Sequence, residues 1–196
     1  MEHQSVDPAA YFHVRIIMGM VLSLSIARLL SGVSIFIQHP ERYAVSWIHI
    51  GWTAFMMLYV IHFWWFEFRL QAVSLITFEI YAFVIVYCSI FFLLCCLLYP
   101  NDIQEYGGYE QYFMARRRWF FGLLAFSYAA DYIDTAIKGM GYFLSLGPEY
   151  PIRNAVFIAL CLVAMFVSSR RFHAAFVGLG IVYQVAWILR AYGALS

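Results

Sequence analysis

Residues 73–99 read VSLITFEIYAFVIVYCSIFFLLCCLLY and contain one Asp, Glu, Lys or Arg residue, Glu79. A transmembrane helix needs about 20 consecutive, mostly apolar residues, so this stretch is long enough to cross a bilayer. It stops at Pro100, where a helix loses a backbone donor, and polar residues follow. The stretch therefore predicts one membrane-spanning helix.

The whole chain has the composition of an integral membrane protein. Of its 196 residues, 64% are hydrophobic and 12% are charged, whereas about 25% of residues are charged in soluble domains. Six spans of about 22 residues would use about 132 positions and leave no room for a catalytic domain outside the membrane. We expect a single transmembrane domain over 1–196, an all-α polytopic helix bundle. Its six transmembrane helices are expected at about 11–37, 44–68, 73–99, 119–140, 152–167 and 172–192.

The longest polar stretch of the chain, residues 102–118, lies between the third and fourth spans. Tyr106, Tyr109 and Tyr112 recur every three residues and lead into three arginines at 116–118. Aromatic and basic side chains in this pattern are typical of a helix that lies at the headgroup level. The sequence therefore predicts a short interfacial helix between the third and fourth spans.

The charged residues also bear on partners and on membrane orientation. A net charge of +1, with basic residues scattered or in short clusters, excludes a nucleic-acid-binding face. With six spans both termini share one side, and arginine clusters at 42, 116–118 and 170–171 lie on the other side. Because basic loops favour the cytoplasm, we expect a bacterial inner-membrane protein with its termini on the periplasmic side.

Small residues recur at every fourth position of the first span, namely Gly19, Ser23, Ala27 and Ser31. Such a stripe lets two helices approach closely in lipid. It predicts either close packing within the chain or a contact between subunits. The expected partners are therefore the lipid bilayer, further copies of this chain in a homo-oligomer, or a separate membrane subunit.

Several ionisable residues fall at membrane depth, where an unpaired charge is expensive. The antiparallel order of the spans brings many of them to the half of the bundle nearest the termini. We expect a hydrated acidic cavity there, open to the terminal side, with Arg28 at its floor. Glu67, Lys138 and Arg190 lie near span ends and are interpreted as interfacial side chains. The candidate ion or proton pathway consists of Asp131, Asp134, His62, Glu79 and Arg28.

The fourth span carries the clearest pattern among these candidates. Ser127, Asp131, Asp134 and Lys138 are spaced four, three and four residues apart and share one helix face. Asp134 and Lys138 can pair one turn apart, which leaves Asp131 to Ser127 or to another helix. His62 is the natural second member of a proton site, because histidine changes its charge near physiological pH.

These observations favour a small membrane protein that conducts or binds protons or small cations through its acidic cavity as a homo-oligomer. Enzyme activity is not indicated, since the sequence lacks a phosphate-binding Gly-x-x-x-x-Gly-Lys motif. Cys88, Cys95, Cys96 and Cys161 lie in apolar runs without metal-ligand spacing. The sequence therefore predicts no metal site.

Two other functions remain open. A redox subunit could hold haem b or quinone, with His62, His13, His49 and His173 as the possible haem ligands. However, His49 and His62 are thirteen residues apart, so their rings leave one helix about 220° apart, and we predict no bound cofactor. The second alternative is an accessory or scaffold subunit whose polar groups only lock the helices together.

Overall fold

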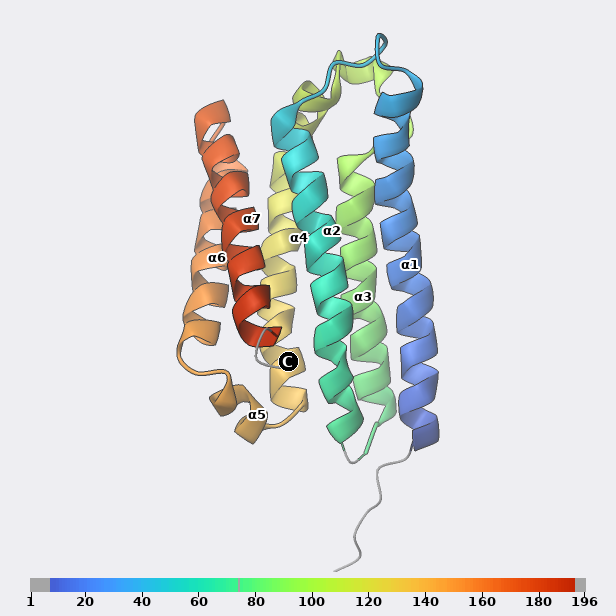
Figure 1. The fold of residues 1–196 in the computed structure, drawn as a ribbon, viewed down its shortest axis with the longest axis vertical. Coiled ribbons are helices and arrows are strands. Elements are labelled where there is room, and N and C mark those ends of the chain that lie inside the picture. The colour runs from blue at the N-terminus through green and yellow to red at the C-terminus, as the bar shows by residue number, and fades with distance from the viewer. Residues whose placement is uncertain (1–7, 74, 193–196) are drawn as a thin grey trace, which may run out of the picture.

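The computed structural model describes residues 8–73 and 75–192, and this part of the chain is helical without any strand. The all-α prediction is therefore confirmed. Two short 3-10 helices, η1 (Glu67–Ala72) and η2 (Gln104–Tyr106), join longer elements. The α-helices are α1 (Pro8–Gln38), α2 (Trp47–Phe66), α3 (Phe78–Leu98), α4 (Tyr109–Ile137), α5 (Met140–Ser145), α6 (Glu149–Phe166) and α7 (Arg170–Tyr192) (Figure 1).

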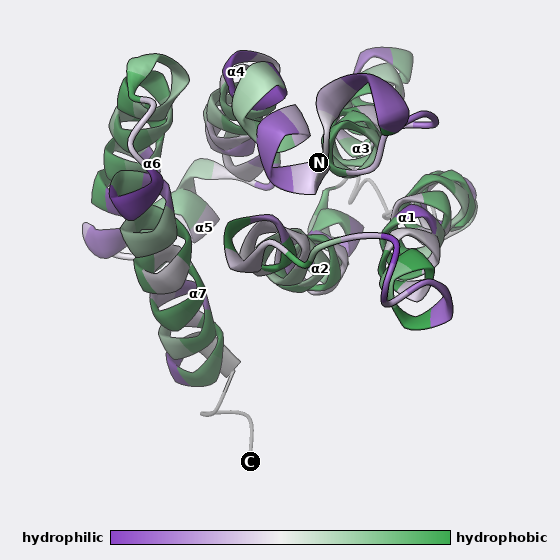
Figure 2. Cartoon of the chain, turned by 90° about the horizontal axis from the view of Figure 1, so that it is seen from above, coloured by the Kyte–Doolittle hydropathy of each residue, from purple (hydrophilic) through white to green (hydrophobic). Residues whose placement is uncertain are grey.

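The long helices run up and down in one bundle. α2 lies between α7 and α1, and α3 and α4 pack along its remaining side (Figure 2). α6 packs against α4, whereas α7 packs mainly against α2. Since α1 begins and α7 ends at the same end of the bundle (Figure 1), we call this the terminal end. The opposite end, which carries Arg42, Arg116 to Arg118, Arg170 and Arg171, is the arginine end.

Four described helices are long and apolar enough to cross a membrane, which indicates an integral membrane protein. They are α1, α3, α6 and α7. Of the six predicted membrane-spanning helices, these four are supported by length and composition. α2 and α4 are not among them, and both carry histidine, tyrosine or aspartate side chains. Most of those side chains are buried and pack against neighbouring helices.

The prediction of a separate interfacial helix is wrong. After η2, two glycines with positive φ angles, Gly107 at 70° and Gly108 at 145°, turn the chain. α4 then begins at Tyr109 and continues through the three arginines without a break. A short helix that was not predicted, α5, lies between α4 and α6. It follows Gly139, whose φ angle is 113°.

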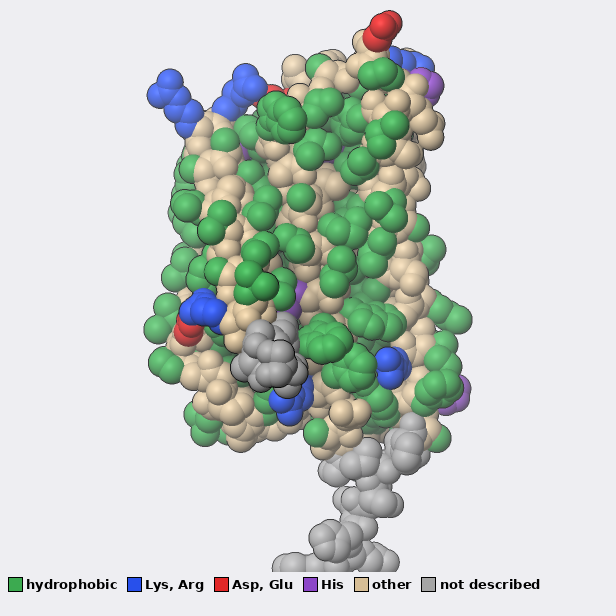
Figure 3. Space-filling model, viewed as in Figure 1, with side chains coloured by type: hydrophobic (Ala, Val, Ile, Leu, Met, Phe, Trp, Pro, Cys, Tyr) green, Lys and Arg blue, Asp and Glu red, His purple; other side chains and the backbone are tan. Residues whose placement is uncertain are grey.

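Aromatic rings fill the middle of the bundle. Trp52 is fully buried, and its ring centroid lies 5.1 to 5.4 Å from those of Phe55, Phe120, Phe121 and Phe176. Large apolar side chains also cover the outside, with charged groups gathered towards the two ends of the face shown in Figure 3. Such an apolar exterior is expected where the surrounding medium is hydrocarbon.

The small residues of α1 divide between two faces. Gly19 packs under the ring of Trp64 on α2. Ser23, Ala27 and Ser31 are exposed instead, so the prediction of close packing within the chain fails for these three. At Gly32, the position after Ser31, the backbone of α1 lies against the ring of Tyr99, which follows α3.

Candidate functional site

Polar side chains from four parts of the chain meet inside the apolar core near the terminal end. They come from η1, α3, α4 and α6, and each has at most 8% of its surface exposed. We call this set the polar network. Its members are Glu67, Tyr87, Asp131, Asp134, Lys138, Tyr150, Arg153 and Asn154.

The first half of the polar network is centred on Lys138, at the end of α4. Its ammonium Nζ lies 2.6 Å from Glu67 Oε1 and 2.5 Å from Asp134 Oδ2. The same ammonium stands 4.1 Å from the ring centroid of Phe66. Asp134 and Lys138 thus form the pair expected from their spacing. The interpretation of Glu67 and Lys138 as interfacial side chains is wrong, because both are buried.

The two carboxyl groups around Lys138 have unused hydrogen-bonding capacity. Within the described chain, Glu67 Oε2 and Asp134 Oδ1 are buried and have no hydrogen-bond partner. The Glu67 and Asp134 side chains also lie close enough to interact directly. If all three groups are ionised, two negative charges face one positive charge. A buried excess charge of this kind is costly unless a proton or a cation balances it.

The second half of the network surrounds Asp131. Its Oδ2 accepts hydrogen bonds from Asn154 Nδ2 over 2.7 Å and from the Tyr150 hydroxyl over 2.8 Å. Arg153 Nη2 lies 3.4 Å from the same oxygen, and the Tyr87 hydroxyl donates to Oδ1 over 3.4 Å. Asp131 is therefore held chiefly by α6, and the Ser127 hydroxyl bonds elsewhere.

Three residues that the sequence interpretation missed come from the start of α6. Tyr150, Arg153 and Asn154 are spaced i, i+3 and i+4, so they share one helix face. Arg153 Nε and Nη2 both donate to Asn154 Oδ1, over 3.0 and 2.8 Å. The guanidinium also stacks 4.6 Å from the ring centroid of Trp187 on α7. This spacing was the available signal in the sequence.

The five predicted pathway residues separate into two groups. Asp131 and Asp134 belong to the polar network, and His62 is buried within electrostatic range of Asp131, Arg153 and Lys138. Glu79 and Arg28 do not join them. The structure thus brings three of the five candidates together.

Arg28 lies near the arginine end, far from the polar network, and is not the floor of a cavity at the terminal end. Its Nη2 donates to the backbone oxygen of Tyr99 over 2.5 Å and to Asn101 Oδ1 over 2.9 Å. A cation at that place stabilises the carbonyl end of α3. Glu79 is exposed in the first turn of α3, beside the capping residue Thr77. The predictions for both residues are wrong, because the helices that carry them differ in length and orientation from those expected.

The network is also more closely packed than expected. The prediction was a hydrated cavity, but the side chains pack directly on one another. A small cavity of about 10 Å³ touches Glu67 and is bordered by Tyr11, Arg15, Met18, Trp64 and Phe68. This volume is at the lower limit for a single water molecule.

The four histidines considered for haem do not form a suitable set. His49 Nε2 lies 2.6 Å from the Leu98 backbone oxygen, and His173 Nε2 lies 2.9 Å from that of Val167. His13 is exposed on α1, and His62 lies towards the opposite end from the other two buried histidines. Over 8–73 and 75–192, no three His, Cys, Asp or Glu residues are arranged to hold a metal ion.

Comparison with known proteins gives no further guide to function. No family model matches the chain, and no curated protein or solved structure shows significant similarity to it. The functional argument therefore starts from the polar network and its charges.

Proposed function

We propose that this chain is a membrane protein that binds and releases one proton at the polar network, and that Glu67 and Asp134 share this proton. One observation carries the proposal: both carboxylates contact the same buried ammonium, and each retains a buried oxygen without a donor in the described chain. A proton between these oxygens removes the excess negative charge and supplies the missing hydrogen bond.

The proposal places six helices across the bilayer. α2 has 20 residues, which at about 1.5 Å per residue span about 30 Å, the thickness of the hydrocarbon core. α4 is longer and lies beside it (Figure 1). α2 and α4 would cross as inner helices with polar groups facing their neighbours. The arginine end would lie in the cytoplasm of a bacterial cell, and the network would exchange protons with the periplasmic side.

A route for this exchange begins at Glu67. The small cavity beside its carboxyl group lies between α1 and η1, near the terminal end. Arg15, on the wall of that cavity, is exposed and stacks 4.8 Å from the ring centroid of Phe68. Movement of these two side chains would open a short path from solvent to Glu67, so that protons enter and leave at one side.

Conduction across the whole membrane needs more than one chain in this proposal. Towards the arginine end, the Tyr59 ring stacks on that of Tyr128, and the core beyond contains Phe55, Phe121 and Trp52. These rings offer no continuous polar path. A second path could form between copies that meet at the exposed small residues of α1. The homo-oligomer expected from the sequence would supply it, and the mass of the purified protein tests this part.

The scaffold alternative draws on the same contacts. Hydrogen bonds to Asp131 join α3, α4 and α6, and the Lys138 pairs join α4 to η1. A protein that uses these contacts only to fix its helices would keep the same protonation state at every pH at which it stays folded. Proton uptake by the folded protein is therefore what separates the two functions.

Infrared difference spectroscopy of the reconstituted protein, recorded across a pH titration, measures this uptake. We expect the C=O stretching band of a protonated carboxylic acid to change with pH in the native protein. Glu67→Gln and Asp134→Asn should each remove or shift that band. Glu110→Gln is the matched control, because Glu110 pairs with exposed Arg170 at the arginine end. If the pH-dependent band is the same in Glu67→Gln and Asp134→Asn as in the native protein, the scaffold function is favoured.

A further inference from the structure

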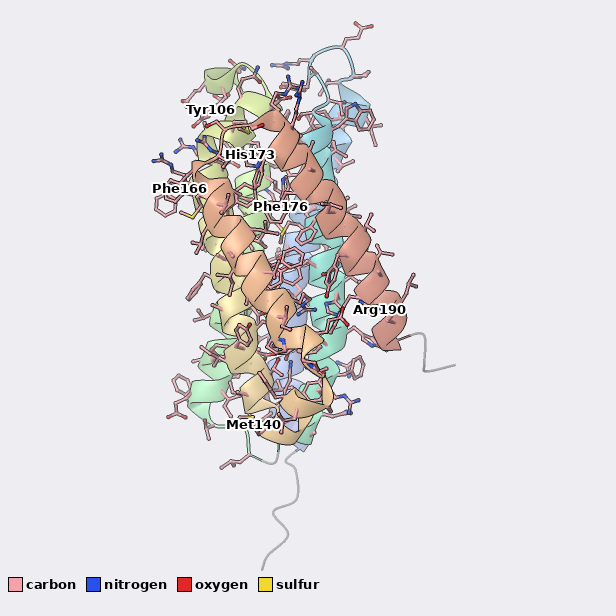
Figure 4. The ribbon with its side chains drawn as sticks, turned by 90° about the vertical axis from the view of Figure 1, so that its left-hand side faces the viewer. Tyr106, Met140, Phe166, His173, Phe176 and Arg190 are labelled. Carbon is pink, nitrogen blue, oxygen red and sulfur yellow. The ribbon has the colours of Figure 1, made fainter. Side chains whose placement is uncertain are left out.

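A groove lies between α6 and α7, which run side by side in Figure 4, while α7 packs mainly on α2. Its volume is about 490 Å³, within the range of about 300–1,000 Å³ typical of small-molecule sites. Aromatic and aliphatic side chains form most of its lining, among them Phe157, Leu160, Phe172, Phe176 and Leu179.

The groove runs lengthwise along the two helices. It extends from Glu149 and Tyr183 near the terminal end to Leu160 and Phe172 further up. From Phe172 to Tyr183, α7 rises about 16 Å, which is about half the thickness of the hydrocarbon core. Leu179 on its wall is 71% exposed, so the groove opens towards the surrounding lipid. An apolar chain oriented like a lipid tail fits this shape.

Arg153 connects the groove to the polar network. Its side chain lines the groove and is buried on the network side. Nε and Nη2 are used by Asn154 and Asp131, but Nη1 makes no hydrogen bond within the part of the chain that the structure describes. One donor of a groove-lining side chain therefore remains for an acceptor oxygen in the groove.

The surrounding charges favour a neutral head group. Glu149 is paired with Arg190, whose Nη2 and Nη1 lie 2.6 and 3.1 Å from its two carboxylate oxygens. The polar network carries either no net charge or one negative charge, depending on its proton, so an anionic head group meets no surplus positive charge. A cationic head group meets no unpaired carboxylate in the groove, because Glu149 is already paired with Arg190.

We propose that the groove between α6 and α7 binds one neutral amphiphile that carries a carbonyl head group on an apolar chain, the chemistry of a membrane quinone. The carbonyl oxygen accepts a hydrogen bond from Arg153 Nη1. The head ring lies against Phe157 and Tyr183, and the chain extends towards Phe172. This site goes beyond the proposed proton function and does not require Glu67 and Asp134 to share a proton.

Decylubiquinone serves as the probe, with the full chain in phosphatidylcholine nanodiscs. The measured quantity is quinone retained per protein above its partition into empty nanodiscs, supported by quenching of the native tryptophan fluorescence. We expect saturable binding with one site. Ala175→Phe should weaken it by about tenfold or more, because Ala175 lines the groove and is exposed, so the larger side chain fills the site without disturbing the core.

Ala174→Phe is the matched control, because Ala174 is also exposed on α7 but does not line the groove. Arg153→Gln tests the head-group contact and should also weaken binding by about tenfold. The proposal is overturned if the two phenylalanine variants bind equally well or if native protein shows no saturable binding. The proposal is also overturned if palmitate or the nanodisc lipid displaces decylubiquinone as strongly as a second quinone does, since neither has a neutral carbonyl ring.

Discussion

The carboxylate of Glu67 accepts a hydrogen bond from the ammonium of Lys138 over 2.6 Å, although 71 residues separate them in the chain. Glu67 follows directly after α2, and Lys138 follows directly after α4. The contact therefore fixes the ends of two neighbouring helices to each other inside the bundle. Asp134 completes a group of three charges that solvent does not screen.

Replacing Lys138 with methionine should strongly destabilise the protein. Lys138→Met leaves two buried carboxylates without their cation, and breaking a buried pair in this way costs about 3–5 kcal/mol. Unfolding in mixed micelles with increasing sodium dodecyl sulfate measures the loss. Arg190→Met, which breaks an exposed pair, is the control and should change stability little. Equal losses in both variants would contradict the central role of the ammonium.

Neutralising all three charges together should recover most of that loss. The triple variant Glu67→Gln/Asp134→Asn/Lys138→Met removes all three charges together, so it leaves none of them buried without its partner. Neutral replacements of buried ion pairs are often well tolerated. The triple variant should therefore unfold at a higher dodecyl sulfate fraction than Lys138→Met alone. If it is the less stable of the two, packing around Phe66 rather than charge explains the single variant.

Removing the Tyr150 hydroxyl should loosen α6 from α4. In Tyr150→Phe the Asp131 carboxylate loses a buried donor at 2.8 Å, and a hydrogen bond to a charged group contributes about 1.5–3 kcal/mol. Tyr183→Phe offers a matched comparison, because the Tyr183 hydroxyl donates to the partly exposed Glu149. The same unfolding assay should show the larger loss for Tyr150→Phe, and the reverse order would contradict the burial argument.

A methyl group at Gly32 should separate α1 from the end of α3. A Cβ atom there would overlap the ring of buried Tyr99, and overpacking of this kind costs about 1–3 kcal/mol. At Gly178 on α7 a Cβ atom would meet nothing within 4 Å, so Gly178→Ala should be neutral or slightly stabilising. Thermal unfolding followed by circular dichroism compares the two variants, and a stable Gly32→Ala would show that Tyr99 can move aside.

Apolar periodicity and polar turns were sufficient to predict most of the fold. The spans expected at 11–37, 152–167 and 172–192 agree closely with α1, α6 and α7. The start of α4 was missed because three consecutive arginines suggested a membrane boundary. In the structure two glycines set the boundary, and the arginines occupy the early turns of a longer helix. Local charge was therefore a poorer guide to helix ends than backbone conformation.

The candidate site was only partly predictable. The pattern of spans indicates how deep a residue lies in the membrane, but not which neighbouring helix its side chain faces. Asp131 and Asp134 were found from their spacing on one helix. Arg153 was missed because its burial depends on how α6 packs against α4, and Arg28 was misplaced because a long helix carried it to the far end. Both errors concern contacts between distant segments, which no local pattern records.

The position of α7 against α2 also has a consequence for biosynthesis. α7 leaves the ribosome after α2, so the flank of α2 that α7 covers stays open to lipid until α7 has been synthesised. A chain truncated after α6 would expose Phe55 and Trp52, which Phe176 and its neighbours otherwise cover. Quality-control proteases would then recognise incomplete chains by this uncovered aromatic surface.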